Sequence, residues 1–272
     1  MAQARPDDRL ADILEGLHAK YNRREFVHPD PLEFLYNYAD ARDREVVGLI
    51  ASGLAYGRVK QILRSVSRVL ERMPEPARFL RETSDGEIVR TFADFRHRVT
   101  SGETLALLLV GMKRVMSEHG SLEACFMSGF REEHETVLPA LSQFVDALTT
   151  AAGACPAHLL SVPAKGGACK RLNLFLRWMV RQDEVDPGGW TGVPRAKLLI
   201  PLDTHMHRIG LAFGFTKRKQ ANLRTATEVT AGFRKLVPDD PVRYDFALTR
   251  LGIRSDADLG EFLKQCGITE TA

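Results

Sequence analysis

The chain has 272 residues, enough for one large domain or two small ones with an ample hydrophobic core. Its 44% hydrophobic and 27% charged residues are typical of a soluble globular protein, and a net charge of +3 points to no class of partner. The sequence has no uncharged apolar run of about 18 residues and no apolar centre of a secretion signal, so we expect a cytoplasmic protein without a membrane span.

Apolar residues recur with the period of a helix through most of the chain. The first long pattern covers 42–70, and Gly53 and Gly57 mark a break within it. Further helices are expected, in chain order, over 102–116, 136–150, 169–180, 204–213, 222–236, 241–249 and 256–265. We find no alternating strand pattern and no Rossmann or P-loop glycine signature. The predicted fold class is therefore all-α.

The helix expected over 169–180 carries a lysine near its start. Its apolar stripe consists of Leu172, Phe175, Leu176 and Met179. Lys170 lies nearly opposite, in line with Arg177 and Arg181, so we expect a basic face that points away from the core. Gly166 and Gly167 permit a tight turn into this helix, and exposed N–H groups at such a start bind phosphate.

A helix start favours the uncharged form of a lysine, because the positive end of the helix dipole opposes a second positive charge. Arg171 acts in the same direction. A lysine nucleophile needs that uncharged amine. The residues alone leave two interpretations of Lys170 open: a nucleophile, or an ordinary surface lysine on an amphipathic helix.

Asp203 precedes the helix expected over 204–213, where aspartate is a preferred N-cap. In a strand it would share one side with His205 and His207, as in a metallohydrolase, but no strand is predicted here and we expect no metal site. In a third interpretation, the carboxylate faces a cleft and stabilises positive charge in a reaction. The residues do not decide between the cap and this third role, and one carboxylate can serve both.

Positive charge is concentrated in one segment. Residues 164–224 contain 12 of the 38 Lys and Arg but 4 of the 35 Asp and Glu, which is +8 against −5 for the rest of the chain. This fits a phosphate-facing surface, or else a solvated lysine-rich face. The four cysteines form no C-x-x-C pair, so we expect free thiols, neither zinc nor an iron–sulfur cluster, and no cofactor.

Two stretches, GGACKRLNLFLRWMV (166–180) and IPLDTHMHRIGLAFGF (200–215), resemble the core of the helix–hairpin–helix, Gly/Pro-Asp (HhH-GPD) DNA glycosylases. In that superfamily a Gly-rich hairpin leads into a helix with the catalytic lysine, and a later V-D-T-H-V-x-R-V segment carries the catalytic aspartate. Lys170 and Asp203 fall on these two positions. Thr204, His205 and Arg208 continue the match, and the stretch 48–66 resembles the superfamily's N-terminal helix and turn.

The chain also departs from that pattern. Its hairpin is not L-P-G-V-G, and 182–199 reads as an insertion between the lysine and the aspartate. The longer spacing resembles the archaeal 8-oxoguanine glycosylase (AGOG) branch, whereas the absence of iron–sulfur cysteines sets the chain apart from endonuclease III. The whole chain, including DPVRYDFALTRLGI (240–253), also resembles a largely uncharacterised bacterial family related to these glycosylases.

The resemblance implies two helical subdomains that flank a cleft, with a helix–hairpin–helix element. We place one subdomain at about 42–135 and the other, with the catalytic segment, at 1–41 and 136–272. The implied activity is base-excision repair by a bifunctional glycosylase and AP lyase, acting as a monomer on double-stranded DNA with a damaged base. The best candidate lesion is 8-oxoguanine, and the enzyme would associate with the nucleoid when bound. Lys170 would form a Schiff base with the deoxyribose, and Asp203 would stabilise positive charge on the sugar.

Other residues receive roles by the same analogy. The amides of Gly166 and Gly167 would hold a phosphate. Trp178 or Trp190 could stack on a base, whereas Phe175 belongs to the core stripe. Asp245 could hydrogen-bond the extruded base, or serve as an acid at a helix start. Further candidates for contact with DNA are Tyr56 and Arg58, which could fill the gap left by the flipped base, and Arg171, His205 and Arg208.

A different class of function remains open. The chain could be a DNA- or RNA-binding protein that keeps a glycosylase-like fold without catalysis, since fold alone does not determine activity.

Overall fold

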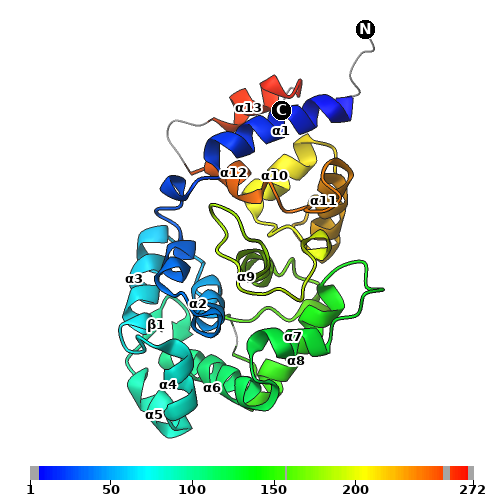
Figure 1. Cartoon of the computed structure of the whole chain (residues 1–272). Coiled ribbons are helices and arrows are strands. Elements are labelled where there is room, and N and C mark those ends of the chain that lie inside the picture. The colour runs from blue at the N-terminus through cyan, green and yellow to red at the C-terminus, as the bar shows by residue number, and fades with distance from the viewer. Residues whose placement is uncertain (1–5, 157, 254–257, 269–272) are drawn as a thin grey trace.

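The structure is a computed structural model that describes residues 6–156, 158–253 and 258–268. It is mostly helical, as predicted (Figure 1). The α-helices are α1 (Pro6–Tyr21), α2 (Ala41–Gly53), α3 (Val59–Leu70), α4 (Pro76–Glu82), α5 (Asp85–Thr91), α6 (Gly102–His119), α7 (Leu122–Ser128), α8 (Leu138–Ala152), α9 (Lys170–Val180), α10 (Thr204–Ala212), α11 (Leu223–Leu236), α12 (Asp245–Arg250) and α13 (Leu259–Gln265). Short 3-10 helices are η1 (Arg24–Phe26), η2 (Pro31–Asn37), η3 (Pro163–Lys165) and η4 (Arg195–Lys197).

The long helices from α2 onward lie close to their predicted bounds. The expected break in 42–70 is present, because α2 ends at Gly53 and Gly57 adopts a positive φ of 98° before α3 begins. The segment 241–244 forms turns, so α12 starts later than predicted, and the predicted residues 256 and 257 of the last helix lie outside the described part. Periodicity missed α1, which has 16 residues and lies before the first predicted range. It also missed α4, α5 and α7, which have seven residues each and so complete only two turns.

One small sheet was not predicted. Strands β1 (Arg96–His97) and β2 (Thr100–Ser101) pair in antiparallel register. Strands of two residues show no alternation that a sequence pattern could reveal.

The helices gather in two groups around α9. Figure 1 shows α2 to α8 at one end of the molecule, α1 and α10 to α13 at the other, and α9 between them. Helix α8 packs on α6 and α7, although the predicted boundary at 135 would place it with the other group. The reason is its apolar face, from which Leu141, Phe144 and Leu148 are buried.

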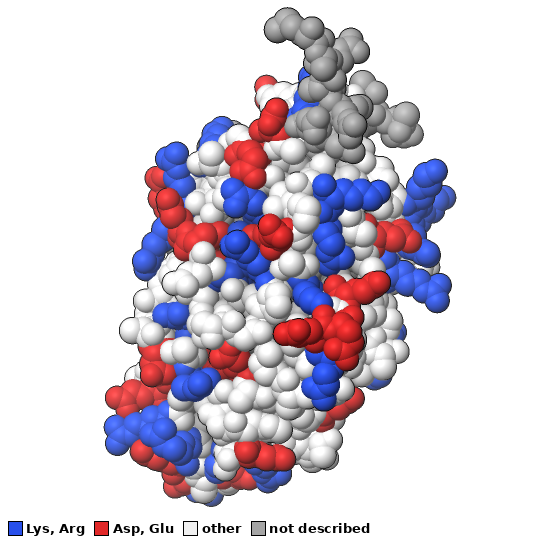
Figure 2. All heavy atoms as spheres, turned by 45° about the vertical axis from the view of Figure 1, so that its right-hand side comes forward, with Lys and Arg blue, Asp and Glu red and all other residues white. Residues whose placement is uncertain are grey.

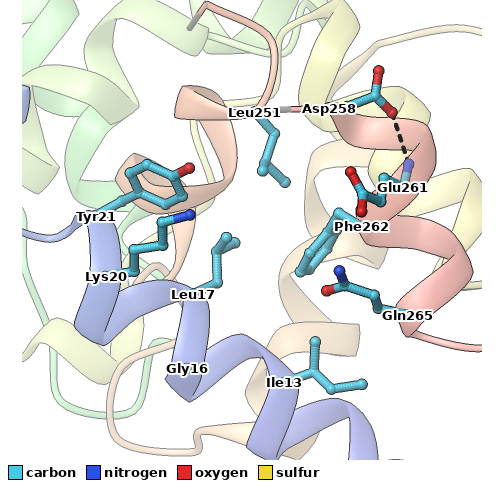
Figure 3. A pocket seen from close by; sticks show the side chains of 10 residues that line it. All are labelled: Ile13, Gly16, Leu17, Lys20, Tyr21, Leu251, Asp258, Glu261, Phe262 and Gln265. Carbon is cyan, nitrogen blue, oxygen red and sulfur yellow. Dashed lines mark hydrogen bonds between the residues drawn. The ribbon is translucent and has the colours of Figure 1, made fainter. Parts of the chain in front are cut away.

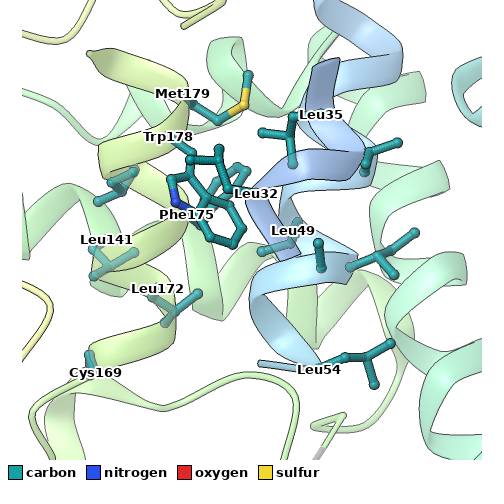
Figure 4. Packing of buried hydrophobic residues seen from close by; sticks show 14 of the residues in the cluster. Leu32, Leu35, Leu49, Leu54, Leu141, Cys169, Leu172, Phe175, Trp178 and Met179 are labelled. Carbon is teal, nitrogen blue, oxygen red and sulfur yellow. The ribbon is translucent and has the colours of Figure 1, made fainter. Parts of the chain in front are cut away.

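Helix α9 is the centre of the core and packs against α2 (Figure 4). The predicted stripe of Leu172, Phe175, Leu176 and Met179 is buried. Gly48 on α2 permits this close contact, because a Cβ at that position would lie 3.3 Å from both Phe175 and Met179. Lys170 at the first residue of α9 is therefore positioned by a helix that is held along its length.

Candidate functional site

Lys170 and Asp203 lie together. The Nζ of Lys170 is 3.4 Å from Oδ2 of Asp203, and the side chains are 36% and 29% exposed. Lys170 is the first residue of α9, and Asp203 is the N-cap of α10, where its Oδ1 accepts a hydrogen bond of 2.8 Å from Met206 N. One carboxylate thus caps a helix with one oxygen and faces the lysine with the other.

Both residues line an open cavity of about 770 Å³. The cavity is bounded by the segment before η2, the α2–α3 connection, the start of α9, the start of α10 and the end of the 251–253 turn. Its polar lining consists of Asp30, Tyr56, Ser161, Lys170, Arg171, Asp203 and Thr204. The apolar residues Val59 and Ile253, which are 38% and 57% exposed, also line it. A cavity of this size and mixed lining can hold a small-molecule group.

Arg171 and Tyr56 form a stacked pair in the cavity wall. The guanidinium carbon of Arg171 lies 5.0 Å from the Tyr56 ring centroid, and its Nη1 donates to Gly53 O. The Tyr56 hydroxyl bonds to His97 O at 2.9 Å and to Thr100 Oγ1 at 2.7 Å. Burial lowers the pKa of both Arg171 and His97. This wall is fixed by interactions with the β1–β2 hairpin.

The expected basic face of α9 is wrong beyond Lys170. The side chains of Arg177 and Arg181 are 3% and 4% exposed, so they do not form a solvent-facing surface. Arg177 pairs with Asp186 and Asp245, and Arg181 pairs with Asp183, Asp186 and Asp240. These two arginines therefore contribute to the core and not to a phosphate-facing surface.

Asp245 is a member of this buried cluster. Its residue is 1% exposed, its Oδ2 pairs with Arg177 Nη1, and it does not line the cavity. Burial raises the pKa of Asp245 to about 6, and the charge of Asp203 adds to the rise while Arg177 opposes it. The structure thus contradicts direct contact with an extruded base at Asp245 and gives it a structural ion pair.

The two tryptophans are also buried. Trp178 is 0% and Trp190 is 3% exposed. The Trp190 indole donates to Glu45 Oε2 at 2.9 Å and packs edge-on against Phe175, with ring centroids 5.2 Å apart. Neither ring can stack on a base in this structure, so that expectation is wrong for both. Trp178 lies on α9, which packs against α2 (Figure 4), and Trp190 is enclosed by the rings of Phe126, Phe144 and Phe175.

The glycine turn before α9 is exposed. Gly166 has a φ of 76° and donates within the turn to Pro163 O, while Gly166 O accepts from Leu223 N at 2.9 Å. Gly167 forms a bridge with Asn222, so the turn is tied to the start of α11. A second cavity of about 650 Å³ beside it is lined by Gly166, Arg218 and Arg224. A ligand phosphate could approach the backbone here, because a Cβ at Gly167 would meet nothing within 4 Å.

The other predicted site residues lie outside the cavity lining. His205 bonds through Nε2 to Leu248 O at 3.1 Å and packs against Gly252. Arg58 and Arg208 are exposed. His207, also on α10, bonds through Nε2 to Arg218 O. The rings of His205 and His207 therefore contact different parts of the chain. Within the described ranges no cluster of His, Cys, Asp or Glu is arranged to hold a metal ion.

Sequence reasoning missed Asp30 and Arg250. Asp30 lines the cavity, and its Oδ2 accepts from Arg250 Nη2 at 3.1 Å. The Asp-Pro pair at 30–31 signals a helix start, and η2 begins there with Asp30 as its N-cap. No local signal indicates that this cap lines the same cavity as Lys170.

The surface carries charges of both signs, and the molecule has a further cavity away from Lys170. Figure 2 shows basic side chains interspersed with acidic ones over the visible face, and not one continuous basic surface. Another cavity of about 440 Å³ lies between α1 and α13, with Lys20, Glu261 and Gln265 among the residues around it (Figure 3).

In the part of the chain that the structure covers, no helix has the length and apolarity needed to cross a bilayer.

Comparison with known proteins places the chain in a family. Neither a curated protein nor a solved structure matches it. Residues 30–254, which include Asp30, Lys170 and Asp203, match the family described as "Protein of unknown function (DUF2400)". Because this match spans most of the sequence, the chain belongs to the DUF2400 family.

Proposed function

We propose that the protein is a DNA glycosylase with AP-lyase activity that excises an oxidised base, with 8-oxoguanine as the best candidate. The observation that carries the proposal is the pairing of Lys170 and Asp203 at 3.4 Å on the wall of an open cavity. An amine beside a carboxylate is the arrangement that Schiff-base chemistry on a sugar requires. The resemblance to the HhH-GPD superfamily falls on these same two residues.

The chemistry begins with a proton. An ion-paired ammonium is no nucleophile, so Asp203 accepts a proton from Lys170 over the short distance between them. The amine lone pair then forms a bond to C1′ of the everted deoxyribose as the bond from C1′ to the base breaks. The electrons of that bond leave with the base, which takes up a proton. When the departing base takes up the proton that Asp203 received, the carboxylate is again ionised and stabilises the positive charge on the sugar.

Strand cleavage follows from the covalent intermediate. The C1′–O4′ bond opens, the nitrogen loses a proton and O4′ gains one, which leaves a Schiff base between Lys170 and C1′. Loss of a proton from C2′ then expels the 3′ phosphate by β-elimination. Water finally releases the sugar fragment from the lysine.

The helical arrangement is consistent with this function. We assign the groups on either side of α9 as the two subdomains and the 163–170 turn as the hairpin of a helix–hairpin–helix element. The exposed turn and the adjacent Arg218 and Arg224 would hold phosphates of one strand. The everted nucleotide would enter the cavity that contains Lys170.

Borohydride trapping tests the proposal. Duplex oligonucleotides with 8-oxoguanine, thymine glycol, uracil or an abasic site are incubated with the protein, and the Schiff base is reduced to a stable adduct. We expect an adduct that disappears in Lys170→Gln and persists in Lys264→Gln, which changes an exposed lysine on α13 outside the cavity lining. A different outcome would identify a non-catalytic binding protein. In that outcome no lesion gives an adduct, and wild type and Lys170→Ala bind DNA equally firmly and with the same salt sensitivity.

A further inference from the structure

The cavity has an acceptor that the Schiff-base chemistry does not use. Among the described residues that line it, the acids are Asp203, which faces Lys170, and Asp30. Asp30 lies on the segment before η2, far in the sequence from both α9 and α10. An ionised carboxylate only accepts hydrogen bonds, so whatever meets Asp30 must present N–H or O–H donors.

Asp30 is held in a fixed position. Its Oδ1 accepts from Leu32 N at 3.0 Å, and its Oδ2 accepts from Arg250 Nη2 at 3.1 Å. Arg250 is 2% exposed, donates also to Phe26 O and lies 4.2 Å from the Phe246 ring centroid. A buried arginine, itself held by these contacts, thus orients the carboxylate. Two oxygens offer about four lone-pair sites, of which these bonds use two.

The side chain of Asp30 remains 20% exposed, and the cavity is the space that it lines. Lys170 and Arg171 supply cationic donors to the same cavity, and Asp203 faces Lys170. Asp30 is therefore the carboxylate of the lining that is left for another part of a ligand. The cationic donors suit a sugar and its phosphate, while this carboxylate suits the donor edge of a base. Adjacent ring N–H and amino groups bind a carboxylate through two parallel hydrogen bonds.

We infer that Asp30 selects the base by accepting hydrogen bonds from a guanine-type edge, on which N1–H and the 2-amino group are neighbouring donors. This inference rests on the proposed function, since it assigns the specificity of the same cavity. An adenine-type edge places an acceptor at N1, opposite the carboxylate, and is disfavoured. The rim residues Val59 and Ile253 add apolar contact but no such discrimination.

Two lesions that differ in this edge provide the test. Single-turnover excision is measured on matched duplexes that carry 8-oxoguanine or 8-oxoadenine, and borohydride trapping is measured on an abasic-site duplex, which has no base to read. We expect wild type to prefer 8-oxoguanine by about tenfold or more, the discrimination that a bidentate pair supplies. Asp30→Asn, which replaces one acceptor by a donor, should abolish the preference and change abasic-site trapping by less than about twofold.

The control variant is Asp40→Asn. Asp40 is the N-cap of α2 and accepts from Arg42 N, as Asp30 does from Leu32 N, but it does not line the cavity. An unchanged preference in Asp30→Asn overturns the inference, and so does an equal loss of excision and abasic-site trapping. Equal excision of both lesions by wild type overturns it as well. Absence of abasic-site trapping in wild type overturns the proposed function itself, and this outcome is distinct from the others.

Discussion

Arg177 and Asp245 form an ion pair in the interior of the protein, with side chains that are 3% and 2% exposed. The same guanidinium lies 3.1 Å from Asp186, so charges fasten α9 both to α12 and to the 183–190 turn. Burial opposes the charge of Arg177, and the two carboxylates outweigh it, which holds the pKa of Arg177 above its usual value. Helix α9, which carries Lys170, is therefore held by ion pairs at Arg177, about two helical turns after Lys170.

Replacing Arg177 by methionine should destabilise the protein strongly. The change leaves the buried carboxylate of Asp245 without its ion-pair partner and leaves Asp186 with Arg181 alone. Breaking a buried pair in this way costs about 3–5 kcal/mol. The free energy of unfolding, measured by urea denaturation, checks this prediction. Arg195→Met removes an exposed arginine and should change stability by less than about 0.5 kcal/mol. Equal effects of the two variants would contradict a structural role for the cluster.

Asp245 should make stability depend on pH. Its pKa is about 6 in the folded protein against 3.8 ordinarily, so between these values the folded protein holds a proton that the unfolded chain has lost. The contribution is therefore lost as pH rises from about 4 to about 6, by up to about 3 kcal/mol. The stability of wild type should fall relative to Asp245→Asn across this window and run parallel to it outside. Asp239→Asn, an exposed acid nearby in sequence, should track wild type throughout.

Asp203 offers a way to separate capping from chemistry. Asparagine keeps an oxygen that can accept from Met206 N but loses the negative charge beside Lys170. Asp203→Asn should preserve stability within about 0.5 kcal/mol and yet reduce Schiff-base trapping by about 100-fold or more. Asp203→Ala should lose the same activity and also about 1 kcal/mol of stability. If both variants trap as wild type does, Asp203 serves only as a cap.

The sequence predicted the elements of this site better than their surroundings. Periodicity located α9 and α10, and the cap signal at Asp203 fixed the start of α10, because both are local properties of the chain. Helix phase also placed Arg177 in line with Lys170 correctly. Helix phase could not reveal that Arg177 pairs with Asp245 of α12, because this contact depends on residues distant in the sequence.

Asp30 illustrates the same limit. Its role as an N-cap is encoded in the neighbouring residues, whereas its position in the cavity depends on how the segment before η2 folds back toward α9 and α10. The prediction that Trp178 or Trp190 stacks on a base was wrong for a related reason, because the burial of both depends on distant residues. A loop residue such as Trp190 reads as accessible, yet its indole finds a buried acceptor on α2.

Trp190→Phe tests that structural interpretation of the indole. The ring contacts with Phe175 can be kept, but Glu45 loses one donor and retains the N–H groups of Leu122 and Glu123 at the start of α7. We expect a loss of about 1–3 kcal/mol in the free energy of unfolding. Schiff-base trapping on abasic DNA at a temperature where the variant is folded should not change. A selective loss of DNA binding would restore a stacking role.

Gly167→Ala examines the turn as a phosphate site. Because a Cβ at Gly167 meets nothing within 4 Å and its φ is not positive, alanine should fit without strain and leave stability unchanged. A methyl group at that position would nevertheless stand between the backbone and a phosphate that approaches it. Affinity for duplex DNA should therefore fall by about tenfold, and the salt dependence of binding should become shallower by about one phosphate contact. The control is Gly16→Ala in α1, where a Cβ likewise meets nothing and no loss of affinity is expected. Unaltered binding by Gly167→Ala would move the DNA backbone away from this turn and leave Arg218 and Arg224 as the contacts to test next.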